Sequence, residues 1–172
     1  FVNCMPSFIG SDPYWGEKFK TANIPLAGDD VKGVVGATIV HRTLAKLCDD
    51  RGTAIDKTYQ INTGGNTDFL NMKEQERLQS KRISKTEAVQ SQLRRRLPEE
   101  NIYVGPSDFI PFLGNTKLMF MRIEGRMWAN MPYNMEVRLE VDDKANSAGI
   151  VVDAIRCAKL ALDRKIGGPI NS

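Results

Sequence analysis

The sequence is poor in the residues that build metal centres and nucleophilic triads, since it contains one histidine and three cysteines. A single imidazole argues against a histidine-based metal site or a nucleophilic triad, and we interpret His41 as structural. The cysteines, Cys4, Cys48 and Cys157, are odd in number, far apart and without metal-ligand spacing. We therefore expect no bound metal and reduced thiols, as in a cytoplasmic protein.

The sequence also lacks long apolar runs and a strong excess of one charge. No stretch approaches the ~20 apolar residues that a membrane helix needs. A net charge of +3 is too small to indicate a nucleic-acid or membrane partner, so we expect neither. Hydrophobic residues at 41% and charged residues at 26% are typical of a globular chain, and 172 residues are enough to bury a core.

What the sequence does contain is a strand, a glycine loop and a helix-forming segment in its middle third. Residues 55–62 alternate in the manner of a strand, and residues 69–79 are polar and rich in helix formers. Between them stands Gly64-Gly65-Asn66-Thr67-Asp68. Such a loop places backbone N–H groups at the carboxyl edge of a sheet, where anionic ligands bind in open α/β folds.

A basic cluster follows this segment. Ser84-Lys85-Thr86-Glu87 fits a capping box, which predicts a helix from Ser84 to about Leu97. Lys85 then lies in the first turn, where a cation costs roughly 0.3–1 kcal/mol against the helix dipole. Lys81 and Arg82 lie just upstream. From the residues alone, the cluster is either a solvated face or a site that binds phosphate or stabilises an enolate.

Helical spacing predicts three further helices. One begins at Ser11-Asp12-Pro13, one spans about residues 31–50 with Asp29 or Asp30 as its cap, and one spans about 147–164. The buried side of the second is expected to comprise Val34, Val35, Thr38, Ile39, Leu44 and Leu47. The core stripe of the third is expected to comprise Ile150, Val151, Ala154, Ile155, Ala158 and Leu162.

Alternation also predicts an antiparallel pair of strands at residues 117–128 and 134–141. In the second, apolar and charged side chains face opposite ways, which is typical of a sheet with one wet face. That polar face could meet solvent or a partner sheet in an oligomer. Shorter strands are expected in residues 1–9, 24–27 and 102–105.

Several separated motifs together resemble one known family, the inositol-1-phosphate synthases in their bacterial and archaeal form. The central motifs are Asn62-Thr-Gly-Gly-Asn-Thr-Asp68 and Ser80-Lys-Arg-Ile-Ser-Lys85. The others, in chain order, are Phe1-Val-Asn-Cys-Met-Pro6, Gly28-Asp-Asp-Val-Lys32, Gly114-Asn-Thr-Lys117, Asn146-Ser-Ala-Gly149 and Gly167-Gly-Pro169. Motifs in the same order along a whole chain are more specific than any one of them.

The resemblance implies an α/β fold, with part of a Rossmann-like NAD-binding domain at the two ends of the chain. Between these ends it implies an inserted α+β catalytic and tetramerisation domain whose open sheet is flanked by helices. The expected divisions are residues 1–52, 53–144 and 145–172. The partner implied is another copy of the chain, in a homotetramer.

The resemblance also implies the reaction, in which glucose 6-phosphate becomes inositol 1-phosphate with tightly held NAD. It implies catalytic roles for Lys81, Lys85, Lys117, Asp68 and Asp30. It implies cofactor contacts from Cys4, Met5, Asp30, Gly65, Asn66, Asp68, Asp143 and Lys144. It implies substrate contacts from Lys32, Lys81, Lys85, Lys117 and Asn66. Clustered ammonium groups suit this chemistry, because they stabilise oxyanions in a water-poor site.

The family pattern is incomplete in this chain. The Gly-rich NAD fingerprint would lie before residue 1 and a further lysine after Ser172, so we expect a longer protein and no turnover by these 172 residues alone. Two alternatives stay open: an NAD-dependent dehydrogenase on the same scaffold with another sugar phosphate, and a non-catalytic oligomerisation module.

Overall fold

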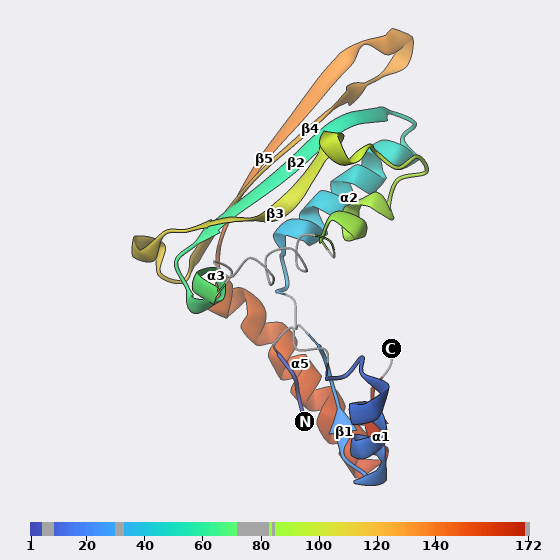
Figure 1. The fold of residues 1–172 in the computed structure, drawn as a ribbon, viewed down its shortest axis with the longest axis vertical. Helices are drawn as coiled ribbons and strands as arrows, with labels where there is room; N and C mark the ends of the chain where they lie inside the picture. Colours follow the sequence, from blue (N-terminus) through green and yellow to red (C-terminus); the bar gives the residue numbers. More distant parts are fainter. Residues whose placement is uncertain (5–8, 30–32, 72–82, 84, 171–172) are drawn as a thin grey trace. The chain divides into compact units, whose positions relative to one another are not determined.

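The structure, a computed structural model, describes residues 1–4, 9–29, 33–71, 83 and 85–170 (Figure 1). The chain divides into two compact units, Val35–Asp143 and Phe1–Val34 with Lys144–Ser172. We call Val35–Asp143 the central unit. Its boundary lies after Val34, and not at the expected residue 52, because the helix that follows Val34 packs on the sheet of the central unit. Among the described residues, no helix is both long enough and apolar enough to cross a bilayer.

The central unit is built on a four-stranded mixed sheet in the order β3-β2-β4-β5. Its strands are β2 (Ala54–Gly64), β3 (Ile102–Phe109), β4 (Thr116–Arg126) and β5 (Pro132–Asp142). β3 runs parallel to β2, whereas β4 is antiparallel to both β2 and β5. Short 3₁₀ turns occur at Glu99–Asn101, Pro111–Leu113 and Trp128–Asn130. The alternation in the sequence thus identified β2, β4 and β5.

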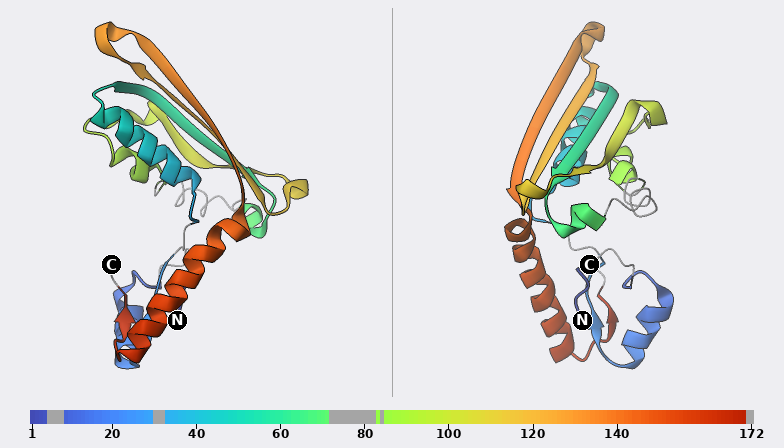
Figure 2. Two further views of the ribbon diagram at one scale, coloured as in Figure 1. Left: turned by 180° about the vertical axis from the view of Figure 1, so that it is seen from behind. Right: turned by 60° about the vertical axis from the view of Figure 1, so that its left-hand side comes forward.

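Two helical segments cover one face of this sheet, as Figure 2 shows from behind and from the side. Helix α2 (Ala37–Asp50) packs over β4, where Met119, Met121 and Ile123 are buried. Residues 85–90 are helical and pack over β3, with Val89 beside Ile102 and Val104. The opposite face is more exposed and carries Tyr59, Phe120 and Arg122.

Helix α2 differs from its expected form in both extent and orientation. It begins at Ala37 rather than Val31, because Gly33 and Gly36 are poor helix formers and Gly36 is the N-cap. Its buried side chains are Ala37, His41, Ala45 and Cys48. Val34 and Leu47, expected in the core, are about half exposed. Small residues bring the helix close to the sheet, and this close approach decides which side of α2 is buried.

The helix expected to run from Ser84 to Leu97 is also shorter. Ser84 lies outside the described residues, and the helix ends at Gln90. The Gln90 side chain explains this ending, since its Nε2 donates to the carbonyl of Leu97 (2.8 Å) and its Oε1 accepts from the Leu97 N–H (3.0 Å). These bonds fold residues 91–97 back as a loop.

The other unit is smaller and contains short parallel strands. Helix α1 (Pro13–Thr21) begins where expected and is capped by Asp12, and β1 (Pro25–Leu26) pairs in parallel with β6 (Gly168–Pro169). Val2 adds a parallel bridge to Ala27. Helix α5 (Asp143–Asp163) buries only Ala161, while Ile155 and Leu162 of its expected core stripe are about half exposed. Ile150, Val151, Ala154 and Ala158 of the stripe are half-buried.

Candidate active site

The candidate site lies where β2 ends, and two glycines shape it. A Cβ on Gly64 would lie 2.5 Å from the ring of Phe69, so the ring occupies the space of a missing side chain. A Cβ on Gly65 would lie 2.4 Å from the backbone N of Gly114 and 2.6 Å from the carbonyl of Ile110. The glycine pair is therefore required by close approach of a ring and of the segment that joins β3 to β4.

Asn66 turns the chain from the strand into helix α3 (Thr67–Asn71). Its Oδ1 accepts from the N–H groups of Asp68 (3.1 Å) and Phe69 (3.3 Å), which caps the short helix. Its Nδ2 donates to Asp143 Oδ2 over 2.8 Å. One side chain thus fixes the loop and reaches a residue that is 77 positions away in the sequence.

Asp143 joins three segments of the central unit. Its N–H donates to the carbonyl of Asn115 (2.9 Å), its Oδ2 accepts from Asn66, and its Oδ1 lies 3.5 Å from Lys117 Nζ. The Lys117 and Asp143 side chains are 23% and 21% exposed. This charged pair is therefore accessible to a ligand but shielded enough to interact more strongly than it would in water.

Lys117 is held on the covered face of the sheet. It pairs with Gly64 across the β2–β4 ladder and precedes the buried Met119 on the same side of β4. Its Nζ lies 5.6 Å from the centre of the Phe69 ring, within the range of a cation–π contact. Phe69 was not among the residues expected from the sequence, and its place in a polar segment gave no signal of this contact.

The structure brings together four of the expected residues, namely Gly65, Asn66, Lys117 and Asp143. Asp68 stands exposed in the first turn of α3, and Lys85 is half-buried in the helix of residues 85–90. Cys4 and Lys144 are exposed residues of the other unit. The remaining expected residues, Met5, Asp30, Lys32 and Lys81, lie outside the described residues.

A second polar cluster occupies the carboxyl ends of the short parallel strands in the other unit. The Asp29 carboxylate accepts from the N–H groups of Gly10 (2.8 Å) and Ser11 (2.7 Å), from Ser11 Oγ (2.8 Å) and from Asn3 Nδ2 (2.7 Å). Burial opposes ionisation, but these bonds outweigh it and lower the pKa of Asp29. Asp29 thus joins two loops instead of capping α2.

His41 has the structural role expected of it. It is fully buried, with Nδ1 3.2 Å from Gln60 Oε1 and Nε2 2.8 Å from Thr58 Oγ1. Burial lowers its pKa to about 4, although the hydrogen bond to Gln60 acts in the other direction. The polar row continues, since Gln60 Nε2 donates to Asn62 Oδ1 and Asn62 Nδ2 donates to the Gly105 carbonyl. This buried row connects α2, β2 and β3.

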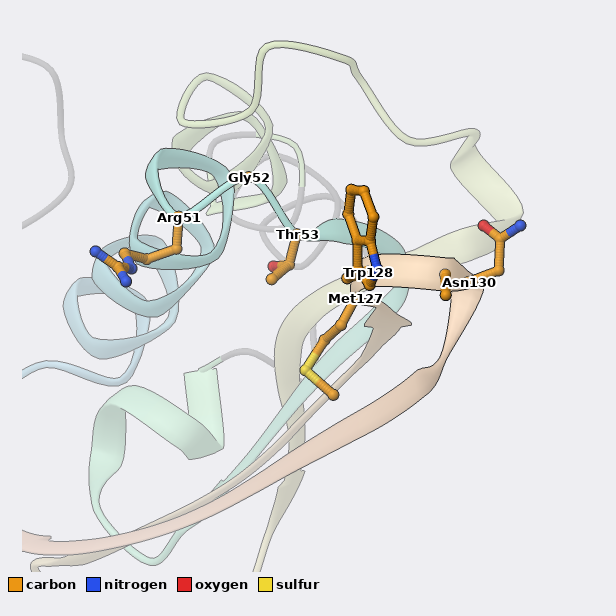
Figure 3. A pocket seen from close by; sticks show the side chains of 7 residues that line it. Arg51, Gly52, Thr53, Met127, Trp128 and Asn130 are labelled. Atoms are coloured by element: carbon orange, nitrogen blue, oxygen red, sulfur yellow. The ribbon is translucent and has the colours of Figure 1, made fainter.

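A hollow of about 500 Å³ lies at the opposite end of β2 (Figure 3). Its lining residues are Arg51, Gly52, Thr53, Met127, Trp128, Ala129 and Asn130. This lining offers no carboxylate and no lysine. It therefore lacks the acid–base groups found where Asn66, Phe69, Lys117 and Asp143 meet, which we call the Lys117–Asp143 cluster. The described residues also contain no group of three or more His, Cys, Asp or Glu side chains that could hold a metal ion.

Comparison with known proteins identifies the family. A family model for myo-inositol-1-phosphate synthase matches residues 36–144, which include every member of the Lys117–Asp143 cluster. The chain belongs to the myo-inositol-1-phosphate synthase family. The resemblance drawn from the sequence motifs is confirmed, and so is the mixed α/β fold class.

Individual relatives and solved structures are similar over nearly the whole chain. An inositol-3-phosphate synthase of Mycobacterium tuberculosis is 54% identical over 99% of the chain, which covers 46% of that protein. The crystal structure of Ari2 matches 98% of the chain and 46% of its own length, with a TM-score of 0.82 and 33% identity. A myo-inositol-1-phosphate synthase-related protein from Thermotoga maritima matches 99% of the chain and 43% of its own length, with a TM-score of 0.80 and 28% identity. The chain spans about half the length of the curated relatives it matches.

Proposed function

We propose that the protein containing this chain converts D-glucose 6-phosphate to 1L-myo-inositol 1-phosphate with NAD as its cofactor. The observation that carries the proposal is the convergence of Asn66, Lys117 and Asp143 from three separate segments of a family member. The reaction requires a cation beside oxygen atoms that become negatively charged. Lys117 supplies one in a site that is shielded from water on most sides.

The other unit, Phe1–Val34 with Lys144–Ser172, offers features that suit a dinucleotide. Its strands are parallel, and the loops at their carboxyl ends carry Cys4, Gly28 and Asp29. Dinucleotides bind at such an edge in doubly wound folds. When bound, NAD would take a hydride from C5 of the sugar and return it after ring closure, so that no net oxidation occurs. We assign cofactor contacts to Cys4, Met5, Asp30, Gly65, Asn66, Asp68, Asp143 and Lys144.

The residues of this chain then divide the remaining tasks. Lys85 would hold the oxygen at C5 and move the proton that leaves C6, after which C6 attacks the aldehyde carbon C1. Lys117 would stabilise the negative charge that develops during this attack, and Asp143 keeps its ammonium in place. Lys81 and Lys32 would contact the phosphate dianion, and Asp68 and Asp30 would orient the lysines.

Replacement of single lysines in the full-length protein tests the proposal. Lys117→Ala and Lys85→Ala are each expected to lower kcat for inositol phosphate formation by at least about 100-fold. Lys46→Ala removes an exposed lysine that pairs with Asp50 on α2 and is the matched control, with unchanged kcat. Product analysis separates the alternatives, because a dehydrogenase would accumulate NADH. Full activity of both variants, with loss of assembly, would instead support an oligomerisation module.

We further propose that the protein is a cytoplasmic homo-oligomer, with a tetramer as the expected state. The open face of the central sheet supports this, since Tyr59 and Phe120 are each about 40% exposed beside the ion pairs of Arg122 with Glu124 and Glu136. All three cysteines are free thiols, as a reducing compartment requires. Sedimentation of the full-length protein, compared with Phe120→Glu, tests the assembly.

A further inference from the structure

The Phe69 ring lies beside Lys117 because of the strand register. Gly64 and Lys117 are directly opposite one another in the β2–β4 ladder, so they share one face of the sheet. Gly64 has no side chain there, and the Phe69 ring fills the space from the first turn of α3. The ring, 3% exposed, therefore lies at the position from which a side chain at residue 64 would have met Lys117.

The contact gives Lys117 a support that a purely apolar side chain would not provide. The covered face of β4 is apolar beyond this point, since Met119 and Met121 are buried. An ammonium at the end of such a face loses part of its hydration, which is unfavourable unless other groups compensate. Among the described residues, the π face of Phe69, 5.6 Å from Nζ, and the Asp143 carboxylate, 3.5 Å from Nζ, provide this compensation.

The same arrangement leaves hydrogen-bonding capacity for a ligand. An ammonium has three N–H donors, and a ring face attracts the whole cation without requiring a directed bond. A hydrogen bond to Asp143 uses one donor, and that carboxylate is itself held by Asn66. Lys117 can therefore be fixed in position while it still donates to an oxygen atom of the substrate.

We propose that Phe69 is a positioning residue, whose ring holds the Lys117 ammonium beside Asp143 so that it meets the negative charge formed during ring closure. The role in ring closure rests on the proposed function, whereas the contact between ring and ammonium does not. A ring that only filled space could be replaced by any apolar group of the same shape. A ring that attracts the cation must lose its effect when electrons are withdrawn from its face.

The first experiment varies the electronic character of the ring without changing its shape. Phenylalanine, monofluoro-, difluoro- and trifluorophenylalanine are placed at position 69 of the full-length protein. We expect log kcat to fall in proportion to the number of fluorine atoms, with a loss of roughly tenfold at three, while KM and the unfolding midpoint change little. The same series at Phe19, in helix α1 of the other unit, is the control and should leave kcat unchanged. Equal kcat values for all four side chains at position 69, in an active enzyme, would overturn the proposal.

The second experiment detects the contact between the Phe69 ring and Lys117 without measuring enzyme activity. With ¹³C-labelled lysine, the ε-methylene signal of Lys117, assigned through Lys117→Arg, should be shifted upfield by the ring current of Phe69. Phe69→Leu should abolish this shift, while Phe69→Tyr should keep it. If the protein does not convert glucose 6-phosphate but the shift is present, the proposed function fails and the ring–ammonium contact stands. If Lys117 gives the same shift with phenylalanine and with leucine at position 69, the proposal is wrong.

Discussion

Asn66 donates a 2.8 Å hydrogen bond to Asp143 and so joins the loop after β2 to the first residue of α5. The bond also orients a carboxylate toward Lys117, at the start of β4. A loop amide, a carboxylate and an ammonium thus form one connected group. The proposed reaction depends on this group more than on any single lysine.

Removing the charge of Asp143 should therefore impair the reaction. In Asp143→Asn, the amide can accept from Asn66 but no longer attracts the Lys117 ammonium as a charged group. We expect kcat for cyclisation to fall by roughly 10- to 100-fold, with a smaller effect on KM. Asp153→Asn makes the same chemical change at an exposed position of α5 and should leave kcat unchanged. Equal rates for the two variants would contradict the role of Asp143.

Gly65 should not tolerate even one methyl group. In Gly65→Ala, the Cβ would lie 2.4 and 2.6 Å from backbone atoms of Gly114 and Ile110, which cannot move aside without displacing the β3–β4 connection. We expect a loss of about 1–3 kcal/mol in the free energy of unfolding, measured by urea denaturation.

The control for Gly65 is Gly149, a residue within α5. An added Cβ there would meet the Val34 side chain at 3.6 Å, an ordinary contact distance. Gly149→Ala should therefore stabilise the protein by about 0.5–1 kcal/mol, because alanine favours the helix more than glycine does. Two alanine variants with the same change in stability would show that the space around Gly65 has been misjudged.

Protonation of His41 should destabilise the fold in mild acid. Its pKa is about 4 in the folded protein and 6.5 in the unfolded chain, so only the unfolded state gains a proton between these values. The free energy of unfolding should lose roughly 3 kcal/mol from this group as the pH falls from 6.5 to 4, and none from it above pH 7.

Carboxylates titrate in the same range, so the effect of His41 is isolated by comparison with His41→Gln. His41 is the only histidine in the sequence, and the variant therefore has no imidazole to protonate. We expect the variant to be less stable than the parent at pH 7, because buried hydrogen bonds are lost, and the difference to shrink toward pH 4. A difference that stays constant across this range would show that His41 titrates normally.

The Asp29 carboxylate should stabilise the loops of the unit that contains Phe1–Val34. Asp29→Asn replaces one acceptor oxygen by a donor that faces the N–H groups of Gly10 and Ser11. We expect a loss of about 1–3 kcal/mol in the free energy of unfolding. Asp12→Asn is the matched control, because asparagine is an equally good helix N-cap and stability should change by only a few tenths of a kcal/mol. If Asp29→Asn and Asp12→Asn have equal free energies of unfolding, Asp29 has no special role in stability.

Much of the central sheet could be predicted because its signal is local. A strand with one buried face alternates along its own sequence, and β2, β4 and β5 were identified from that pattern alone. The glycine pair and Asn66 likewise predicted a turn, since a loop of this composition needs only local chemistry. The structural role of His41 was also predicted from the sequence.

Packing, in contrast, decided which sides of the helices are buried. Apolar spacing placed Val34 and Leu47 in the core, but small residues of α2 face the sheet, and His41 meets polar partners on β2. The end of the helix at Gln90 depends on a side chain that binds Leu97 seven residues later. Such choices depend on the partner surface, which the sequence of a helix does not contain.

By itself, the sequence determined the family, the strands of the central sheet and the glycine loop, because each is encoded in residues that are close together in the chain. Only the tertiary structure decided that Phe69, Lys117 and Asp143 meet. Their meeting requires the β2–β4 register, an empty position at Gly64 and the end of β5, which come from distant parts of the chain. Contacts between distant residues arise from pairing and packing, and no local pattern specifies them.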